Sequence, residues 1–439
     1  MQAARRNDAA ATMPVMPERK HLLCAIGSCL TAMSLFGASA TAVGAQLPLA
    51  ARLERQFVAS GGVGGAIAVD LQSGAVIWQH KPDTSRIPAS VNKLFTTAAV
   101  LLDLGPNRRL RTLAVAPTPV AAAAADGGTA PGADAAALID AKGNLKGNLF
   151  IKGGGDPTLG PTGIAELATA VSAAGIKAIP GKVIGDDGLF DRIRGIPALG
   201  GVDSDQGGLL GGLAYDHDGS ARAAATAFAL ALRRAGVKVP RGHAGIGTAP
   251  VTATTLASHD SAPISTLIRL TNQPSDNFYA EMLTKVHGAL KLNLGTTAAG
   301  LKAAAVALAR IGVKPKRVDG SGLSRGNRTS ARTVERLLAN LAANRAFVGS
   351  LAVAGQSGTL ADRMGRTPAA GRCRGKTGTL SNVSGLAGFC KTPQGRTIAF
   401  AMLMNSLNSV SAARRSQDQI VKALATWSPA ATPAPASRP

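Results

Sequence analysis

The chain has 439 residues, 46% of them hydrophobic, which is long enough for about two to three domains with sizeable cores. Aromatic residues make up only 3% of the chain, which argues against the base-stacking surface of a single-strand nucleic-acid binder. The formal net charge of +23 instead favours electrostatic association with an anionic cell envelope; the alternative is a basic protein without a polyanionic partner.

The N-terminal segment predicts export. Arg19 and Lys20 precede an apolar run at residues 22–36, and small residues continue from there to Ala45. This is the pattern of a secretory signal peptide, and the run is short for its alternative, a membrane anchor. We therefore expect residues 1–45 to be removed as the protein crosses the inner membrane into the periplasm.

The first part of the mature chain, residues 46–105, shows the pattern of a sheet with helices. Alternating apolar residues on either side of a Gln-Ser-Gly turn are typical of a β-hairpin. The expected elements are a helix at 47–57, hairpin strands at 66–70 and 75–78, and a loop leading into a buried helix at 85–104.

Residues 106–259 differ in composition and predict an inserted α+β region of one or two small modules. A stretch rich in Ala, Gly and Pro at residues 117–131 predicts a surface loop. The elements expected after it are a strand at 147–152, a helix at 164–174, a strand at 181–185, a helix at 221–235 and a short strand at 237–239.

Residues 260–427 return to the first texture. They are mostly helical as far as residue 343, and the stripe of Val334, Leu337, Leu338 and Leu341 has helical spacing. A hairpin, an apolar strand at 397–405 and a helix at 412–426 follow, before a Pro/Ala tail at 428–439 that predicts disorder. Because both ends supply strands and helices, we expect one sheet completed by both termini.

Cys373 and Cys390 are the two cysteines that remain after signal removal. They flank a hairpin whose turn centres on Ser381 and Asn382, so they fall opposite each other on antiparallel strands. Directly opposed residues come close enough for a bridge, and an exported protein meets oxidising conditions. We predict a disulfide; the alternative is two buried free thiols.

Three short motifs could carry chemistry: Ser90-Val-Asn-Lys93, Ser275-Asp-Asn277 and Lys376-Thr-Gly378. A spacing of three on a helix places Ser90 and Lys93 on one face. A serine hydroxyl needs a base, and a lysine serves as one only where burial or a second cation lowers its pKa. Lys376 is a suitable second cation.

The remaining motif residues suit a peptide substrate. The Ser275 hydroxyl can relay a proton to the leaving group, and the Asn277 amide can hold a peptide carbonyl. A strand edge with Lys376, Thr377 and Gly378 can pair with an extended peptide, Gly378 permitting close approach. The Lys376 ammonium and the Thr377 hydroxyl then face the terminal carboxylate of the substrate. Each motif alone has an ordinary alternative: a helix N-cap, a turn or a hairpin end.

Taken together, the motifs S-x-x-K, S-x-N and K-T-G are the signature of penicillin-recognising serine enzymes. Longer stretches resemble the low-molecular-mass class C D,D-peptidases, peptidase family S13, over roughly residues 50–425. These stretches begin at Pro88, Gly147, Asn272, Asp319 and Lys376. The resemblance implies an α+β fold with a β-lactamase/transpeptidase-like domain, in which helices flank an antiparallel five-stranded sheet.

The resemblance also implies an activity. A protein of this family is a penicillin-sensitive serine D-alanyl-D-alanine carboxypeptidase, and an endopeptidase toward peptide cross-links, that cuts peptidoglycan through an acyl-enzyme. Its partners are stem peptides ending in D-Ala-D-Ala and β-lactam antibiotics, which are covalent inhibitors. No metal, other cofactor or nucleic acid is expected.

The same resemblance assigns a role to each motif residue and adds two others. The assignments are Ser90 as acylated nucleophile, Lys93 as its base, Ser275 as proton shuttle, Asn277 as substrate ligand, Lys376 and Thr377 as carboxylate ligands, the N–H groups of Ser90 and Thr379 as oxyanion hole, and Asp156 and Arg325 as the lining of a pocket for the substrate's diamino-acid side chain.

Other interpretations are weaker. Residues 322–326 fit the G-x-S-x-G elbow of α/β-hydrolases but lack the buried strand that must precede it. Residues 375–377 mimic the end of a phosphate-binding loop whose earlier glycine is replaced by Ala370. A peptidoglycan-binding protein without turnover, and a β-lactamase, stay open as alternatives to the peptidase.

Overall fold

The structure of the protein is a computed structural model that describes residues 47–118 and 138–429. The predicted signal peptide, residues 119–131 of the predicted loop and the tail from residue 430 lie outside the described residues. All described residues belong to one compact unit that begins at Leu47.

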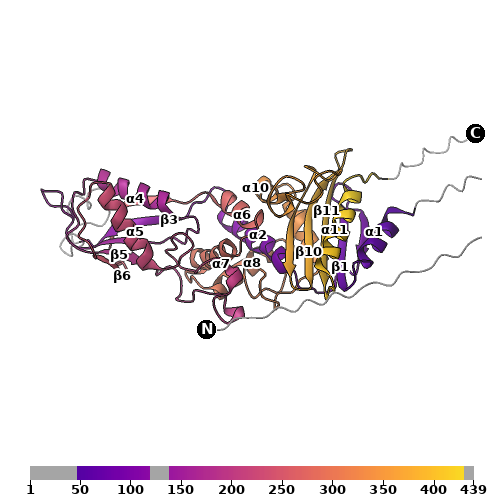
Figure 1. Cartoon of the computed structure of the whole chain (residues 1–439), viewed down its shortest axis with the longest axis horizontal. Coiled ribbons are helices and arrows are strands. Elements are labelled where there is room, and N and C mark those ends of the chain that lie inside the picture. Colours follow the sequence, from indigo (N-terminus) through magenta and orange to yellow (C-terminus); the bar gives the residue numbers. More distant parts are fainter. Residues whose placement is uncertain (1–46, 119–137, 430–439) are drawn as a thin grey trace, which may run out of the picture. The chain divides into compact units, whose positions relative to one another are not determined.

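The first sheet is antiparallel throughout and has the strand order β2-β1-β11-β10-β9-β8. Its strands are β1 (Val63–Asp70), β2 (Val76–His80), β8 (Ala352–Val353), β9 (Cys373–Leu380), β10 (Val383–Lys391) and β11 (Thr397–Asn405). The N-terminal strand β1 pairs with the C-terminal strand β11 along its whole length, so both ends of the chain complete one sheet (Figure 1). The sheet has six strands rather than the five expected, because the two-residue β8 adds to the edge of β9.

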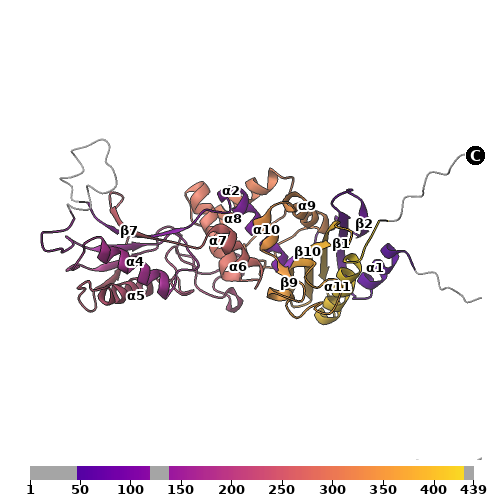
Figure 2. The same cartoon turned by 90° about the horizontal axis from the view of Figure 1, so that it is seen from above.

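Strand β11 shows why this sheet is covered on both faces. Ala399, Ala401 and Leu403 point into one core, while Phe400 and Met402 point into the other, with the period of two that a strand imposes. One core contains α1 (Leu49–Val58) and α11 (Val410–Leu424), which lie side by side in Figures 1 and 2. The other contains α2 (Lys93–Leu104), α6 (Ile264–Asn272), α7 (Asn277–Leu292), α8 (Thr297–Ala309), α9 (Ala331–Leu341) and α10 (Arg345–Gly349).

Residues 111–260 form a second sheet with its own core, which confirms the α+β class of the inserted region. The order is β6-β5-β4-β3-β7, with β4-β5 and β5-β6 parallel and the other pairs antiparallel. The elements are β3 (Arg111–Ala116), β4 (Leu149–Lys152), α4 (Pro161–Ala173), β5 (Val183–Asp186), α5 (Ala221–Arg234), β6 (Ala244–Ile246) and β7 (Thr254–Asp260). One sheet carries all the described strands of the region.

The prediction of a strand at residues 237–239 is wrong. Lys238 makes only an isolated bridge to Ala178, and the strand after α5 is β6 instead. The edge strand β7 escaped prediction because five of its seven residues are polar and its two apolar residues are adjacent, which leaves no apolar alternation to detect.

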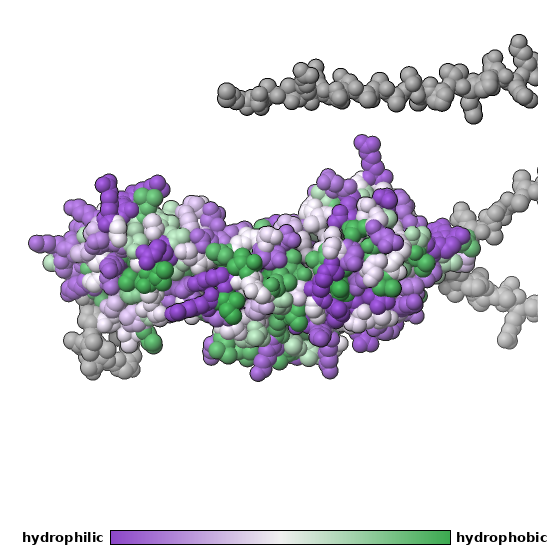
Figure 3. Space-filling model, turned by 60° about the horizontal axis from the view of Figure 1, so that its bottom comes forward, coloured by the Kyte–Doolittle hydropathy of each residue, from purple (hydrophilic) through white to green (hydrophobic). Residues whose placement is uncertain are grey.

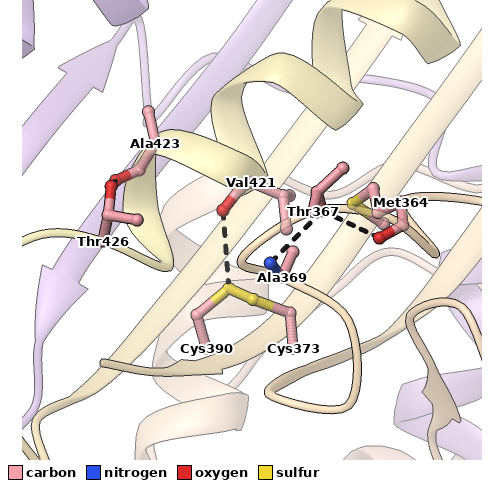
Figure 4. Close-up of a disulfide and its surroundings, with 8 residues drawn as sticks. All are labelled: Met364, Thr367, Ala369, Cys373, Cys390, Val421, Ala423 and Thr426. Atoms are coloured by element: carbon pink, nitrogen blue, oxygen red, sulfur yellow. Dashed lines mark hydrogen bonds between the residues drawn. A yellow bond between two sulfur atoms is a disulfide. The ribbon is translucent and has the colours of Figure 1, made fainter. Parts of the chain in front are cut away.

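Cys373 and Cys390 face each other across β9 and β10 in the register that the hairpin predicts, and their sulfur atoms are bonded at 2.09 Å. Figure 4 shows this disulfide beneath α11, with Cys390 Sγ 3.9 Å from the carbonyl oxygen of Val421. Both cysteines are buried. The bridge therefore joins the two strands next to the helix that covers them.

Removing the disulfide should destabilise the protein without abolishing its fold. The bridge closes a sequence separation of 17 residues. Closing a loop of that size lowers the conformational entropy of the unfolded chain, which stabilises the folded state by about 3 kcal/mol. We expect a Cys373→Ala/Cys390→Ala variant to lose about that much free energy of unfolding in denaturant titrations. A reductant should destabilise the wild type and not the variant. Equal stability of wild type and variant would contradict the bridge.

Candidate active site

The first motif forms a tight turn rather than the first turn of a regular α-helix. Ser90 lies in the 3₁₀ helix η1 (Ala89–Asn92), and Lys93 begins α2 directly after it. Ala89 adopts φ +48°, a left-handed conformation that is unusual outside glycine and asparagine. The spacing of three still brings the two side chains together, because Lys93 Nζ donates to Ser90 Oγ at 3.0 Å.

Lys93 has the surroundings that a lysine base requires. Its side chain is fully buried, and Nζ also donates to Asn277 Oδ1 at 2.5 Å and to the Ser321 carbonyl at 2.8 Å. Burial lowers the pKa of Lys93 to about 8, against the opposing effect of the carboxylates of Asp319 and Glu281. A neutral amine in contact with a serine hydroxyl can accept its proton.

This pKa predicts how the reaction depends on pH. Lys93 can accept a proton only when neutral, so acylation of Ser90 should speed up as pH rises and level off above about pH 8. The measurement is the rate of labelling by a fluorescent penicillin between about pH 6 and 9.5. A rate that is flat or falls across this range would contradict the role of Lys93 as base.

Lys376 departs from the sequence-based expectation. Its side chain is fully buried on β9, and its Nζ donates to the carbonyl of the adjacent Thr377 at 2.8 Å. Burial, and then the charge of Lys93, hold the pKa of Lys376 well below its usual value. Burial is the largest cause of the lowered pKa of Lys93, and the charges of Lys93 and Lys376 oppose each other, as the lowered pKa of Lys376 shows.

The second motif starts α7. Asp276 is the N-cap residue, and its carboxylate accepts from the Tyr279 backbone N–H at 2.8 Å. Ser275, directly before it, has φ +68°, in the left-handed region. Asn277 accepts from Lys93 through Oδ1 and donates through Nδ2 to the Asp205 carbonyl at 2.7 Å. The amide predicted to hold substrate is thus also a clamp between Lys93 and the inserted region.

The third motif lies on β9. Thr377 donates to Thr359 Oγ1 at 2.8 Å, and Thr379 Oγ1 accepts from Arg414 at 2.9 Å. A Cβ on Gly378 would stand 2.6 Å from the Pro88 carbonyl and 3.2 Å from the Ser90 nitrogen. Gly378 therefore allows β9 to approach the turn that carries Ser90.

The edge of β9 next to this motif is free for a further strand. Strand β8 pairs only with Arg374 and Gly375. Across the part of the chain that the structure describes, no strand pairs with Lys376–Leu380 on that side. An extended peptide could add to this edge by backbone hydrogen bonds.

The loop at residues 319–325 packs against the Ser90 turn. Gly322 has φ +90°, and a Cβ there would lie 2.0 Å from the Ala89 carbonyl. Asn92 donates to Asp319, whose carboxylate also accepts from the Gly322 and Ser324 backbone N–H groups. Buried contacts of this kind fix the position of Ser90.

A cavity of about 760 Å³ opens in front of Ser90. Six of the predicted site residues line it, together with several that the sequence did not single out. The lining residues are Ser90, Asp205, Ser275, Asn277, Leu323, Arg325, Thr359, Arg363, Thr377, Thr379, Leu380, Ser381 and Arg414. Lys93 contacts Ser90 from the buried side. Among the residues missed from sequence, Arg363 and Arg414 come from distant segments and belong to no motif.

Of the two residues assigned to a side-chain pocket, the structure brings only one to the cavity. Arg325 lines it and donates to Ser381 and Asn382 at the β9–β10 turn. Asp156 is buried elsewhere, where its Oδ1 accepts from the N–H and hydroxyl of Thr158. Burial raises the pKa of Asp156. Its Oδ1 fixes the turn at Thr158, while its buried Oδ2 has no hydrogen-bond partner among the described residues.

Known proteins of similar sequence are carboxypeptidases. The sequence model of the D-Ala-D-Ala carboxypeptidase 3 (S13) family matches residues 48–129, 135–207 and 212–427. A D-alanyl-D-alanine carboxypeptidase from an Actinomadura species is 30% identical over 528 residues, covering 97% of this chain and 91% of that protein. Carboxypeptidase DacB of Mycolicibacterium smegmatis is 28% identical over 77% of this chain and 75% of its own length.

Solved structures share the fold. Penicillin binding protein 4 from Haemophilus influenzae has a TM-score of 0.71 at 20% identity, covering 86% of this chain and 99% of that one. A predatory endopeptidase from Bdellovibrio bacteriovorus has a TM-score of 0.53 at 20% identity, over 82% and 91%. These matches confirm the fold class and the enzyme class predicted from the motifs. The chain belongs to the D-Ala-D-Ala carboxypeptidase 3 (S13) family.

Proposed function

We propose that this serine peptidase removes the terminal D-alanine from peptidoglycan stem peptides through an acyl-enzyme on Ser90. The observation that carries the proposal is the contact of 3.0 Å between the buried Lys93 amine and the Ser90 hydroxyl, at the wall of a cavity beside a free strand edge. An extended peptide on that edge would place a carbonyl carbon against Ser90.

The reaction has two acyl-transfer steps. Ser90 Oγ bonds to the carbonyl carbon of the penultimate D-alanine while its proton passes to Lys93. The N–H groups of Ser90 and Thr379 are the proposed donors to the developing oxyanion. The C–N bond then breaks, and the proton reaches the leaving amine through Ser275. A water molecule, deprotonated in turn by Lys93, hydrolyses the ester and frees Ser90.

β-Lactams would acylate the same serine. The Haemophilus influenzae protein has also been solved in complex with a β-lactam, and a Bdellovibrio bacteriovorus endopeptidase has been solved acylated by penicillin G. Endopeptidase action is the same chemistry on a cross-link, where the amine that leaves belongs to a second peptide.

Hydrolysis of a synthetic stem peptide tests the proposal. We expect the wild type to release D-alanine, benzylpenicillin to block the release, and Ser90→Ala to lack it. Release by Ser90→Ala, or none by a folded wild type, would overturn the proposal. The second outcome would favour the binding protein without turnover.

A β-lactamase is the competing enzyme, and the cavity favours the peptidase. Rapid hydrolysis of a penicilloyl ester needs a carboxylate general base in the class A enzymes. Among the described residues that line the cavity there is no glutamate, and the acidic one is Asp205, which belongs to none of the three motifs. We expect penicillin to stay bound for many minutes rather than turn over.

We also propose that the enzyme works in the periplasm, close to the cell envelope. The motivation is the predicted signal peptide and the net charge of +23. Hydrophilic residues are spread over the face seen in Figure 3 rather than gathered at one point. No single helix of residues 47–118 and 138–429 is long and apolar enough to cross a membrane, although α7 and α8 together, bent by 74°, meet the length and composition criteria.

Cosedimentation of the protein with cell walls should weaken as the salt concentration rises. Binding unaffected by salt would contradict the electrostatic association.

A further inference from the structure

The substrate of the proposed reaction carries a carboxylate beside the nitrogen that leaves, so the cavity needs a cation to meet it. Lys376, the cation in the motif, does not line the cavity. Its ammonium is fully buried against the Thr377 carbonyl, and burial and Lys93 disfavour its charged form. The cavity wall instead carries three guanidinium groups, those of Arg325, Arg363 and Arg414.

Two of these three are already engaged. Arg363 pairs with Asp418 on α11, Nε at 3.0 Å and Nη2 at 2.7 Å, and both side chains are mostly buried. Arg325 donates from both terminal nitrogens to the β9–β10 turn, at 3.1 Å to Asn382 Oδ1 and 2.7 Å to the Ser381 carbonyl. Neither group is free to turn its donors toward a ligand without losing these partners.

Arg414 is different. Its side chain makes one hydrogen bond, from Nη2 to Thr379 Oγ1 at 2.9 Å, and it pairs with no carboxylate among the residues that the structure describes. An arginine has five N–H donors, so most remain available. Arg363 donates to the Arg414 carbonyl at 3.3 Å, which ties this part of α11 to the cavity wall.

We propose that Arg414 binds the substrate carboxylate next to the scissile amide, side by side with the Thr379 hydroxyl. This inference rests on the proposed function and names the recognition element of that site. A guanidinium and a carboxylate form two parallel charge-assisted hydrogen bonds, a geometry that a buried lysine cannot offer. Arg363 and Arg325 raise the positive potential of the cavity without contacting the carboxylate themselves.

The test compares two peptides that differ only in this charge: one ending in D-Ala-D-Ala with a free carboxylate, the other ending in the C-terminal amide. Arg414→Ala should lower kcat/KM for the acid by about tenfold to 100-fold, the loss expected for a charge-assisted hydrogen bond. It should leave kcat/KM for the amide unchanged, so the preference for the acid falls by the same factor. Arg414→Lys should restore part of the preference for the acid, since a lysine keeps the positive charge but cannot form the two parallel hydrogen bonds of a guanidinium.

Arg415→Ala is the matched control, because Arg415 is the next residue of α11, is exposed and does not line the cavity. It should leave the preference for the acid intact. Equal losses for acid and amide in Arg414→Ala would overturn the inference, since Arg414 would then only position Thr379. An unchanged preference would overturn it too. Failure of the proposed function would give a different result from failure of this inference. In that case the wild type would hydrolyse neither peptide and would not be acylated by penicillin.

Discussion

Lys93→Met should lower the rate of Ser90 acylation by about 10³-fold, the range that general-base catalysis contributes. Methionine keeps an apolar chain of similar length in the buried site but has no lone pair that can accept the serine proton at working pH. The Asn277 and Ser321 oxygens lose their donor, while the cost of burying an ammonium disappears. The fold should therefore survive, as a melting curve would show.

A second buried lysine supplies the control. Lys285 on α7 is fully buried, pairs with Asp191 at 2.5 Å and donates to the Ile193 carbonyl at 2.7 Å. Lys285→Met also removes a buried ammonium. It leaves the Asp191 carboxylate without its ion-pair partner and should lower the free energy of unfolding. It should leave the acylation rate per folded molecule close to that of the wild type. Acylation of Lys93→Met within about tenfold of the wild type would exclude Lys93 as the base.

Gly378→Ala should slow acylation by about 100-fold, although it adds a single methyl group to a strand. The new Cβ would stand 2.6 Å from the Pro88 carbonyl and 3.1 Å from the Val91 nitrogen, so β9 and the Ser90 turn must move apart. A displacement of about 1 Å at reacting groups costs about that factor. The measurement is the second-order rate constant for labelling by fluorescent penicillin.

Gly245→Ala is the matched change for this prediction. Gly245 also lies within a strand, β6, where a Cβ would meet only Ile184 at 3.9 Å. This variant should be acylated at the wild-type rate. If Gly378→Ala keeps the wild-type rate as well, the contact between β9 and the Ser90 turn does not set the geometry of the site.

The sequence could predict what depends on local spacing. The contact between Ser90 and Lys93 follows from a separation of three residues in a helical turn, and it survives the change from α-helix to 3₁₀ helix. The register of Cys373 and Cys390 follows from the position of the hairpin turn. Such geometry is fixed within a few residues and needs no knowledge of the rest of the chain.

What depends on packing between distant segments could not be predicted. The chain contains 48 Lys and Arg residues, and only the packing of α11 against β10, which lets Arg414 reach Thr379, distinguishes Arg414 from the others. The contact of Gly378 with the Ser90 turn could not be predicted for the same reason, since its neighbour there is the Pro88 carbonyl. The burial that withdraws Lys376 from the cavity is likewise a tertiary effect.

The most direct test of the central claim is mass spectrometry of the protein after brief exposure to benzylpenicillin. We predict one penicilloyl adduct per chain, on the peptide that contains Ser90, and none in Ser90→Ala. An adduct on Ser275 or another residue, or a folded wild type that stays unmodified, would contradict the assignment of Ser90 as the nucleophile.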